Sequence, residues 1–153
     1  MPSTSVIDKN MAAPSQDERV LAVVIPAYNE EKTIEQILTK IDALPMVREI
    51  IVVDDGSKDN TIACVEAFDS DRIRLIRQDR NQGKTAAVRR GVSEVTSPLT
   101  IIQDADLEYD PEEIPFVIDP ISRAVPTWST AADFWSAGLH VCSISTTTWP
   151  TSF

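Results

Sequence analysis

Short apolar runs punctuate the middle of the chain and predict strands. Leu21–Pro26 (LAVVIP), Glu49–Val53 (EIIVV) and Leu99–Gln103 (LTIIQ) are nearly all apolar, which is typical of strands buried on both faces. A fourth run, Ile73–Arg77 (IRLIR), alternates apolar and charged residues and predicts a strand with one more polar face.

The segments between these runs have the spacing of helices. Glu31–Leu44, Asn60–Phe68 and Lys84–Val95 are the predicted helices. The first has a regular apolar stripe made of Ile34, Ile37, Leu38 and Ile41. The resulting order, β-α-β-α-β-α-β, predicts an α/β fold with a mostly parallel sheet and right-handed crossovers. Ligands of such sheets bind at the carboxyl ends of the strands, so the loops there are the candidate site.

This alternation of predicted strands and helices ends at about residue 120. Between 119 and 153 only Asp119, Arg123 and Asp133 carry a formal charge, although the chain has 14 Lys and Arg and 24 Asp and Glu residues. All 3 tryptophans lie in the same stretch, which shows neither a helical nor an alternating period. We therefore expect a disordered polar leader over 1–19, one domain over 20–121, and an irregular, poorly ordered tail over 122–153.

Composition excludes several functional classes. The net charge of −10 opposes binding to nucleic acids and anionic membranes, both of which favour a basic surface. No apolar run approaches the roughly 20 residues that span a bilayer, so we expect a cytoplasmic protein without a transmembrane segment. Cys64 and Cys142 have no partners at zinc-ligand spacing and are expected to be free thiols.

Polar residues follow the first predicted strand directly. Pro26 and Ala27 end this strand, and Tyr28 and Glu30 come next, where a ribose or a base can be held. The alternative is a helix start without a ligand, because Glu30 suits the positive end of a helix.

Asp54 and Asp55 follow the second strand and open the turn DDGSKDNT. Two adjacent carboxylates at the end of a buried strand are costly unless they are paired or hydrogen-bonded. One of them can accept a hydrogen bond from the ring N–H of uracil or guanine. The alternative is an ordinary turn rich in Asp. An EF-hand is excluded, because the D-x-D-x-D-G spacing and the distal Glu are absent.

Two further motifs suit a diphosphate and its cation. Lys84 follows Gly83 at a helix start, and although G-K-T is only a fragment of a phosphate loop, Lys84 can reach a diphosphate. Asp104-Ala105-Asp106 ends the fourth strand, and strand alternation starts both carboxylates on one side, with room behind Ala105. Hard carboxylates suit Mg²⁺ or Mn²⁺, which neutralises a diphosphate leaving group. A solvated turn is the alternative.

The strings VVIPAYNEEKTI, EIIVVDDGSKDNT, NQGKTAAVRRGV and IIQDADLEYDPEEIP stand in this order between about residues 20 and 118. Together they resemble family 2 glycosyltransferases of the GT-A fold, most closely the polyprenyl- and dolichyl-phosphate sugar synthases. The resemblance implies a Rossmann-like nucleotide-sugar-binding half, a divalent cation, and transfer of a sugar with inversion from a UDP- or GDP-linked donor. It also implies a lipid-phosphate acceptor and membrane association in full-length relatives.

The resemblance assigns roles to individual residues. Those expected to contact the donor nucleotide are Pro26, Ala27, Tyr28, Glu30, Asp54, Asp55, Lys84, Asp104 and Ala105. Either Asp54 or Asp55 is expected to hold the base, and Asp104 and Asp106 the metal. The family's general base comes later in the pattern, so no catalytic residue is assigned in this chain.

The tail departs from the family pattern. Relatives carry a stretch like ADVVYGSRF soon after the Asp-rich motif, whereas this chain reads PTWSTAADF from Pro126. A set of codons can be chosen that encodes PTWSTAADF and spells ADVVYGSRF when it is read one base out of frame. We therefore expect a frame shift near Ser122–Val125, loss of the acceptor half, and little or no transferase activity, because catalysis needs donor and acceptor held together.

Two other functions are compatible with parts of the sequence. A sugar nucleotidyltransferase has a similar nucleotide-binding architecture, but it would show a Gly-rich basic loop where this chain reads PAYNEE. A non-catalytic nucleotide-binding module is compatible with a missing acceptor half.

The predicted frame shift can be tested by sequencing the gene. Read one base out of the present frame, the codons for residues 126–153 should encode a glycosyltransferase-like continuation that includes ADVVYGSRF. A shifted frame without such a segment would contradict the hypothesis.

Overall fold

The computed structural model describes residues 19–118 and the strand His140–Ser143. Residues 1–18, 119–139 and 144–153 lie outside the described part of the chain. The expected leader and most of the expected irregular tail fall in these ranges.

The described residues form one parallel sheet. Its order is β3-β2-β1-β4-β5, and every neighbouring pair is parallel. The strands are β1 (Leu21–Ala27), β2 (Val47–Asp54), β3 (Ile73–Arg77), β4 (Leu99–Ile102) and β5 (His140–Ser143). The mostly parallel α/β fold expected from the apolar runs is confirmed.

The sequence does not predict β5. Its residues belong to the segment expected to be irregular, yet they pair with β4 from Leu99↔His140 to Ile102↔Ser143. The tail is therefore not irregular at these residues. So short a strand carries little pattern of its own, and its pairing depends on the edge that β4 offers.

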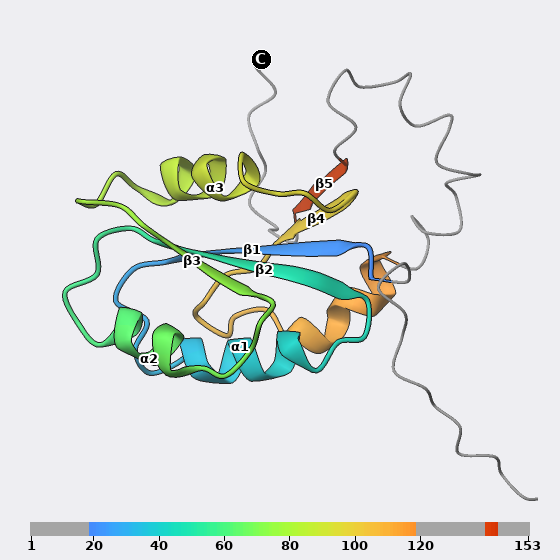
Figure 1. Cartoon of the computed structure of the whole chain (residues 1–153), viewed down its shortest axis with the longest axis horizontal. Coiled ribbons are helices and arrows are strands. Elements are labelled where there is room, and N and C mark those ends of the chain that lie inside the picture. Colours follow the sequence, from blue (N-terminus) through green and yellow to red (C-terminus); the bar gives the residue numbers. More distant parts are fainter. Residues whose placement is uncertain (1–18, 119–139, 144–153) are drawn as a thin grey trace, which may run out of the picture.

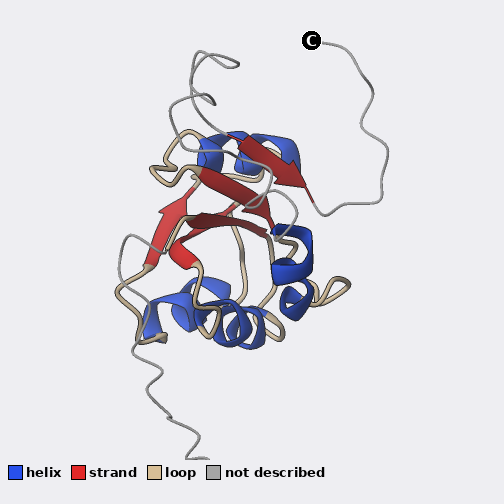
Figure 2. Ribbon diagram, turned by 90° about the vertical axis from the view of Figure 1, so that its right-hand side faces the viewer, coloured by secondary structure: helices blue, strands red, loops and turns tan. Residues whose placement is uncertain are grey.

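Helices cover both faces of the sheet (Figure 1). The described helices α1 (Ile34–Asp42) and α2 (Thr61–Ala67) lie on one face and α3 (Lys84–Val92) on the other, as the turned view in Figure 2 also shows. The 3-10 helix η2 (Pro111–Glu113) continues as α-helix through residue 118 and contacts α1. α1, α2 and α3 are each shorter than predicted, because predicted residues at their ends lie in turns, bends or irregular backbone.

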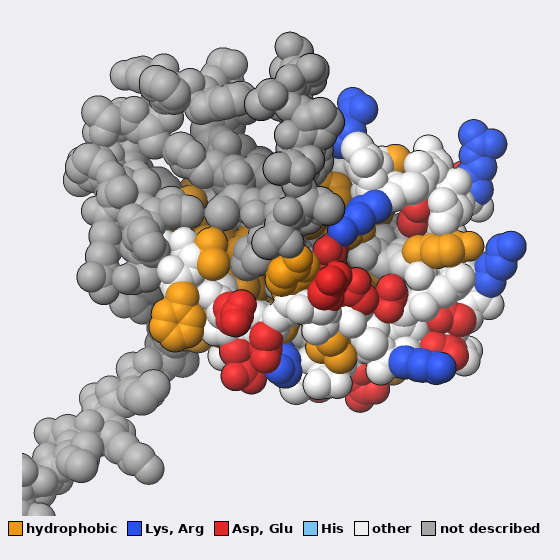
Figure 3. All heavy atoms as spheres, turned by 180° about the vertical axis from the view of Figure 1, so that it is seen from behind, with side chains coloured by type: hydrophobic (Ala, Val, Ile, Leu, Met, Phe, Trp, Pro, Cys, Tyr) orange, Lys and Arg blue, Asp and Glu red, His pale blue; other side chains and the backbone are white. Residues whose placement is uncertain are grey.

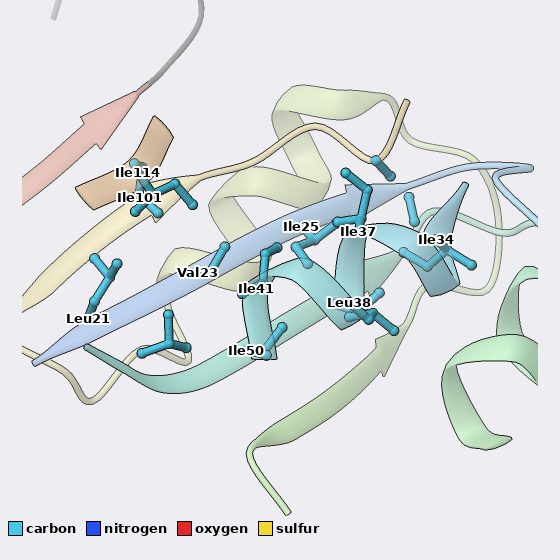
Figure 4. Close-up of a cluster of buried hydrophobic side chains, with 14 of the residues drawn as sticks. Leu21, Val23, Ile25, Ile34, Ile37, Leu38, Ile41, Ile50, Ile101 and Ile114 are labelled. Atoms are coloured by element: carbon cyan, nitrogen blue, oxygen red, sulfur yellow. The ribbon is translucent and has the colours of Figure 1, made fainter. Parts of the chain in front are cut away.

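The larger core lies between the sheet and the layer of α1 and α2 (Figure 4). Leu21, Val23 and Ile25 of β1 face this layer, whereas Val24 belongs to the smaller cluster under α3. This division follows from the alternation of side chains along a strand. The predicted stripe on α1 is confirmed, because its residues Ile34, Ile37, Leu38 and Ile41 are fully buried in this core.

Small residues let α3 pack closely on the other face. A Cβ atom on Gly91 would overlap Val24 Cγ1 and would lie 3.0 Å from Val53 Cγ2. Ala87, one turn earlier, is fully buried in the same cluster. This close contact fixes α3 over β1 and β2 and places its first residue, Lys84, at the carboxyl edge of the sheet.

At the amino-terminal ends of the strands, Glu49 in β2 links β2 to the loop before β4. Its Oε1 accepts hydrogen bonds from the backbone N–H and the hydroxyl of both Thr96 and Ser97, at 2.7 to 3.1 Å. Its Oε2 lies 3.4 Å from an Arg74 nitrogen. Partial burial opposes ionisation, but the hydrogen bonds from Ser97 and Thr96 outweigh it and lower the pKa of Glu49 below its ordinary value of 4.5.

We expect Glu49→Gln to lower the free energy of unfolding near neutral pH by about 1 kcal/mol, an amount limited by partial solvent screening. A lowered folded-state pKa means that the carboxylate stabilises the fold above the unfolded-state pKa of about 4.5. This contribution is lost as the pH falls through the folded-state pKa. Urea unfolding of both proteins at about pH 7 and about pH 3 should therefore show the difference shrinking in acid.

Glu35→Gln is the control for this measurement, because it makes the same chemical change at an exposed position of α1. It should alter stability by less than about 0.5 kcal/mol at both pH values. A Glu49→Gln loss that is equal at the two pH values would contradict the role of the charge.

Candidate functional site

The chain changes direction across the sheet between β1 and β4. β2 and β3 follow on one side of β1, whereas β4 pairs with its other side. Loops that leave the two strands at such a switch point diverge and open a crevice at the carboxyl ends. A cavity of about 250 Å³ lies there, lined by Pro26, Ala27, Tyr28, Glu30, Asp55, Asn81, Gly83, Lys84, Ala87, Asp104, Ala105 and Asp106.

The loop after β1 is held by the loop after β2. The Asn29 N–H donates to Ser57 Oγ at 2.9 Å, and Asn29 Oδ1 accepts from the Lys58 N–H at 2.8 Å. Asn29 has a φ of 57°, a left-handed conformation that Asn adopts more readily than most residues. The chain therefore turns sharply beside Tyr28, whose side chain lines the cavity and is 40% exposed.

The next residues are anchored to the start of α2. The Glu30 N–H donates to Thr61 Oγ1 at 2.8 Å, and the Glu31 N–H donates to Asp59 Oδ2 at 3.1 Å. Desolvation opposes ionisation of Asp59, but hydrogen bonds from Thr61 and Glu31 outweigh it and lower the pKa of Asp59. The turn after β2 thus positions the residues that follow β1.

Asp54 stabilises its own turn. Its Oδ2 accepts the N–H of Gly56 at 3.1 Å and that of Ser57 at 3.2 Å. Its Oδ1 is buried and has no hydrogen-bond partner in the part of the chain that the structure describes. Asp54 is not among the residues that line the cavity, so the structure places this expected base ligand outside it.

Asp55 lines the cavity and holds the loop that leads into α3. Its two carboxylate oxygens accept the N–H groups of Gln82 and Gly83, each at 2.7 Å. The residue is 3% exposed, and hydrogen bonds to a charged acceptor are among the stronger ones. Asp55 therefore fixes the backbone directly before Lys84.

Lys84 forms an ion pair with Asp104 in the cavity. Its Nζ lies 2.7 Å from Asp104 Oδ1 and 2.8 Å from Oδ2. The Asp104 side chain is 13% exposed, and that of Lys84 is 57% exposed. A sheltered carboxylate requires a partner, and Lys84 provides one.

Asp106 lines the same cavity from a more exposed position. Its Oδ1 accepts the N–H of Glu108 at 3.0 Å, and the intervening Leu107 has a φ of 62°. Mg²⁺ is commonly held by one or two carboxylates together with phosphate oxygens. Asp104 and Asp106 fit this donor set. The Lys84 ammonium beside Asp104 shows that a positive charge is accommodated next to this carboxylate. Among the described residues no group of three or more His, Cys, Asp or Glu is arranged to hold a metal.

The structure gathers most of the predicted site residues. All the expected donor contacts except Asp54 line the cavity, as does Asp106. Sequence reasoning missed Asn81, Gly83 and Ala87 as lining residues. The Gly and the small Ala residues of the string NQGKTAA are the only sequence signal for them, because Gly permits the φ of 91° seen at Gly83 and Ala87 is small enough to be fully buried.

Residues 22–129 match the family described as Glycosyl transferase family 2. The chain belongs to this family. The matched range contains all four strand-end motifs and ends inside the segment for which a frame shift is predicted. Membership in this family favours a glycosyltransferase over the sugar nucleotidyltransferase considered above.

Several similar proteins have dolichol-phosphate or undecaprenyl-phosphate transferase names. Dolichol-phosphate mannosyltransferase of Pyrococcus furiosus is 38% identical over 106 residues, which cover 67% of this chain and 30% of that protein. Undecaprenyl-phosphate 4-deoxy-4-formamido-L-arabinose transferase of Erwinia tasmaniensis is 38% identical over 112 residues, which cover 68% and 34%. The chain therefore spans about a third of the length of these curated relatives.

Solved structures show the same GT-A-like fold. Glucosyl-3-phosphoglycerate synthase of Mycobacterium tuberculosis in complex with UDP has a TM-score of 0.59 at 29% identity, covering 69% of this chain and 41% of that chain. The same enzyme with Mn²⁺, UDP-glucose and phosphoglyceric acid has a TM-score of 0.59 at 28% identity, covering 69% and 40%. Within the described ranges of the present chain, no helix has the length and apolar character of a membrane span.

Asp55→Asn should loosen the loop before α3. An Asn side chain has only one acceptor oxygen, so its NH₂ group would face the N–H of Gln82 or Gly83, leaving a part-buried donor without a partner. We expect a stability loss of about 2 kcal/mol and faster hydrogen exchange at these two amides, measured by NMR.

Asp54→Asn is the matched control. Its single oxygen can still accept from Gly56 and Ser57, while its NH₂ replaces an oxygen that has no hydrogen-bond partner among the described residues. Exchange at Gln82 and Gly83 should then stay as slow as in the wild type. Similar exchange in the two variants would show that Asp55 does not hold the loop.

Proposed function

We propose that this chain forms the donor-binding half of a glycosyltransferase that moves a sugar, with inversion, from a nucleoside-diphosphate sugar to an acceptor. The observation that carries the proposal is the cavity at the β1–β4 switch point, where the Lys84–Asp104 pair and Asp106 share a lining with Tyr28 and Glu30. Such a cavity offers carboxylates that can hold a cation and a lysine that can pair with an anion, beside polar groups that can orient a nucleoside.

A UDP-linked sugar is the donor that we infer. Support comes from the similar structures that contain UDP or UDP-glucose. The chain has a net charge of −10, and acidic side chains gather near the middle of the face in Figure 3. An anionic diphosphate therefore needs local positive charge, which Lys84 and a divalent cation would provide.

Different residues of the cavity lining would bind different parts of the donor. Pro26, Ala27, Tyr28 and Glu30 would receive the base and ribose. Asp55, rather than Asp54, would accept from the base, since Asp55 lines the cavity and each of its oxygens keeps a second acceptor site beyond the loop hydrogen bond.

Asp104 and Asp106 would hold Mg²⁺ or Mn²⁺. When bound, this cation would neutralise negative charge on the departing nucleoside diphosphate. Ala105 between the two carboxylates is 3% exposed and packs into the larger core, which fixes the backbone from which they extend.

A polyprenyl phosphate is the acceptor class that we infer, because the similar transferases are named for dolichol-phosphate and undecaprenyl-phosphate. A long lipid chain keeps such an acceptor in a membrane, so the whole enzyme would act at a membrane surface. No catalytic base is assigned among the described residues. The predicted frame shift would also remove the acceptor half, so we infer that this chain binds the donor and transfers little sugar.

Isothermal titration calorimetry tests the donor site. UDP, GDP and UDP-glucose are titrated with and without Mn²⁺, and we expect UDP to bind on the order of tenfold more tightly with Mn²⁺ because the cation bridges carboxylates and phosphates. Asp106→Asn should remove most of this dependence.

Asp110→Asn is the control, because Asp110 is an exposed acid on the same loop that pairs with Lys40 at 2.9 Å. It should leave the Mn²⁺ dependence of UDP binding intact. UDP binding that is absent, or that is equal with and without Mn²⁺, would contradict the proposed donor site.

A further inference from the structure

The Lys84–Asp104 ion pair uses the carboxylate that the proposed function assigns to a divalent cation. Lys84 Nζ contacts both Asp104 oxygens, at 2.7 and 2.8 Å. Those two oxygens are also the atoms through which Asp104 would bind a metal ion. An ammonium and a divalent cation at this distance repel each other strongly. The ion pair and the cation therefore compete for Asp104.

Lys84 is free to move away from Asp104. Its side chain is 57% exposed, and its ammonium is carried by a flexible four-carbon stem. Apart from its two chain neighbours, no described residue has a heavy atom within 4 Å of the position where a Cβ of Gly83 would lie, so the space beside the start of α3 is open. Lys84 therefore has room at the cavity to exchange one partner for another.

The fold does not depend on this ion pair. Asp55 already anchors the Gln82 and Gly83 amides, and the close packing at Gly91 seats α3 on the sheet. The lysine end of the pair is 57% exposed, so solvent screens the interaction and the pair adds little to the stability of the fold. The geometry thus leaves Lys84 available for a role in binding.

We propose that Lys84 substitutes for the divalent cation while the donor is absent. It neutralises Asp104 in that state, and it moves to the diphosphate when the cation and the nucleotide bind together. The identity of the nucleotide rests on the proposed function, whereas the competition at Asp104 does not.

This exchange couples the two binding events. A cation that binds alone must displace Lys84 and leave its ammonium nearby without a carboxylate. A nucleoside diphosphate gives that ammonium a new anionic partner. Each ligand therefore raises the affinity of the other, and by linkage the factor is the same in both directions.

Lys84→Met tests the exchange on the full chain. Mn²⁺ binding is measured without nucleotide, by electron paramagnetic resonance of the free ion, and UDP binding is measured at saturating Mn²⁺ by calorimetry. We expect Mn²⁺ alone to bind at least about fivefold more tightly, because competition and repulsion are removed. UDP should bind at least about fivefold more weakly, because the diphosphate loses a cationic partner. The two affinities thus change in opposite directions.

Lys58→Met is the matched control. It removes the same charge from an exposed position on the loop after β2, and Lys58 does not line the cavity. Both affinities should stay within about twofold of the wild type, since Lys58 lies outside the cavity lining and salt screens the charge of an exposed side chain. Asp104→Asn should abolish the gain when it is combined with Lys84→Met.

The outcomes separate the two proposals. Mn²⁺ affinity that is unchanged or lower in a folded Lys84→Met protein, with thermal unfolding like that of the wild type, overturns the exchange. UDP that binds neither protein, together with tighter Mn²⁺ binding in Lys84→Met, overturns the proposed donor but supports the competition at Asp104. If Lys58→Met raised the Mn²⁺ affinity as much as Lys84→Met, the change in net charge alone would explain the gain, and the exchange would also be overturned.

Discussion

The parallel pairing of β1 with β2 on one side and β4 on the other is the constraint on which the site depends. Because the chain leaves these strands in different directions, their carboxyl ends cannot be covered by one connection, and a crevice forms between them. The register is held by side chains buried on both faces, such as Val23 and Val24. A slip of one residue in β4 would turn Asp104 toward the opposite face of the sheet.

The four loops at this edge stabilise one another. The turn after β2 does most of this, since Ser57, Asp59 and Thr61 hold the loop after β1 and Asp55 holds the loop before α3. Several of these bonds end on carboxylates whose charge is compensated by backbone N–H groups. A motif that reads as one ligand-binding turn is therefore also the scaffold on which the other ligand-binding residues are arranged.

Charge balance links the fold to the chemistry of family 2 glycosyltransferases. A cavity that gathers carboxylates must be neutralised, and Lys84 does this at Asp104 in the present structure. The same carboxylates suit a divalent cation, and the same lysine suits a diphosphate. In such a site Asp104 can be neutralised either by Lys84 or by a divalent cation, so that it is paired in both states.

The sequence by itself determined the strands β1 to β4, the buried face of α1 and most of the cavity-lining residues, because burial periods and turn residues are local properties of the chain. It left open which of Asp54 and Asp55 faces the cavity, since two adjacent identical side chains differ only in how the strand end turns. The tertiary structure decided this, and it also decided the pairing of Lys84 with Asp104 and the addition of β5 beside β4. These contacts join residues far apart in sequence, and their energies depend on distances that only the packed sheet and helices set.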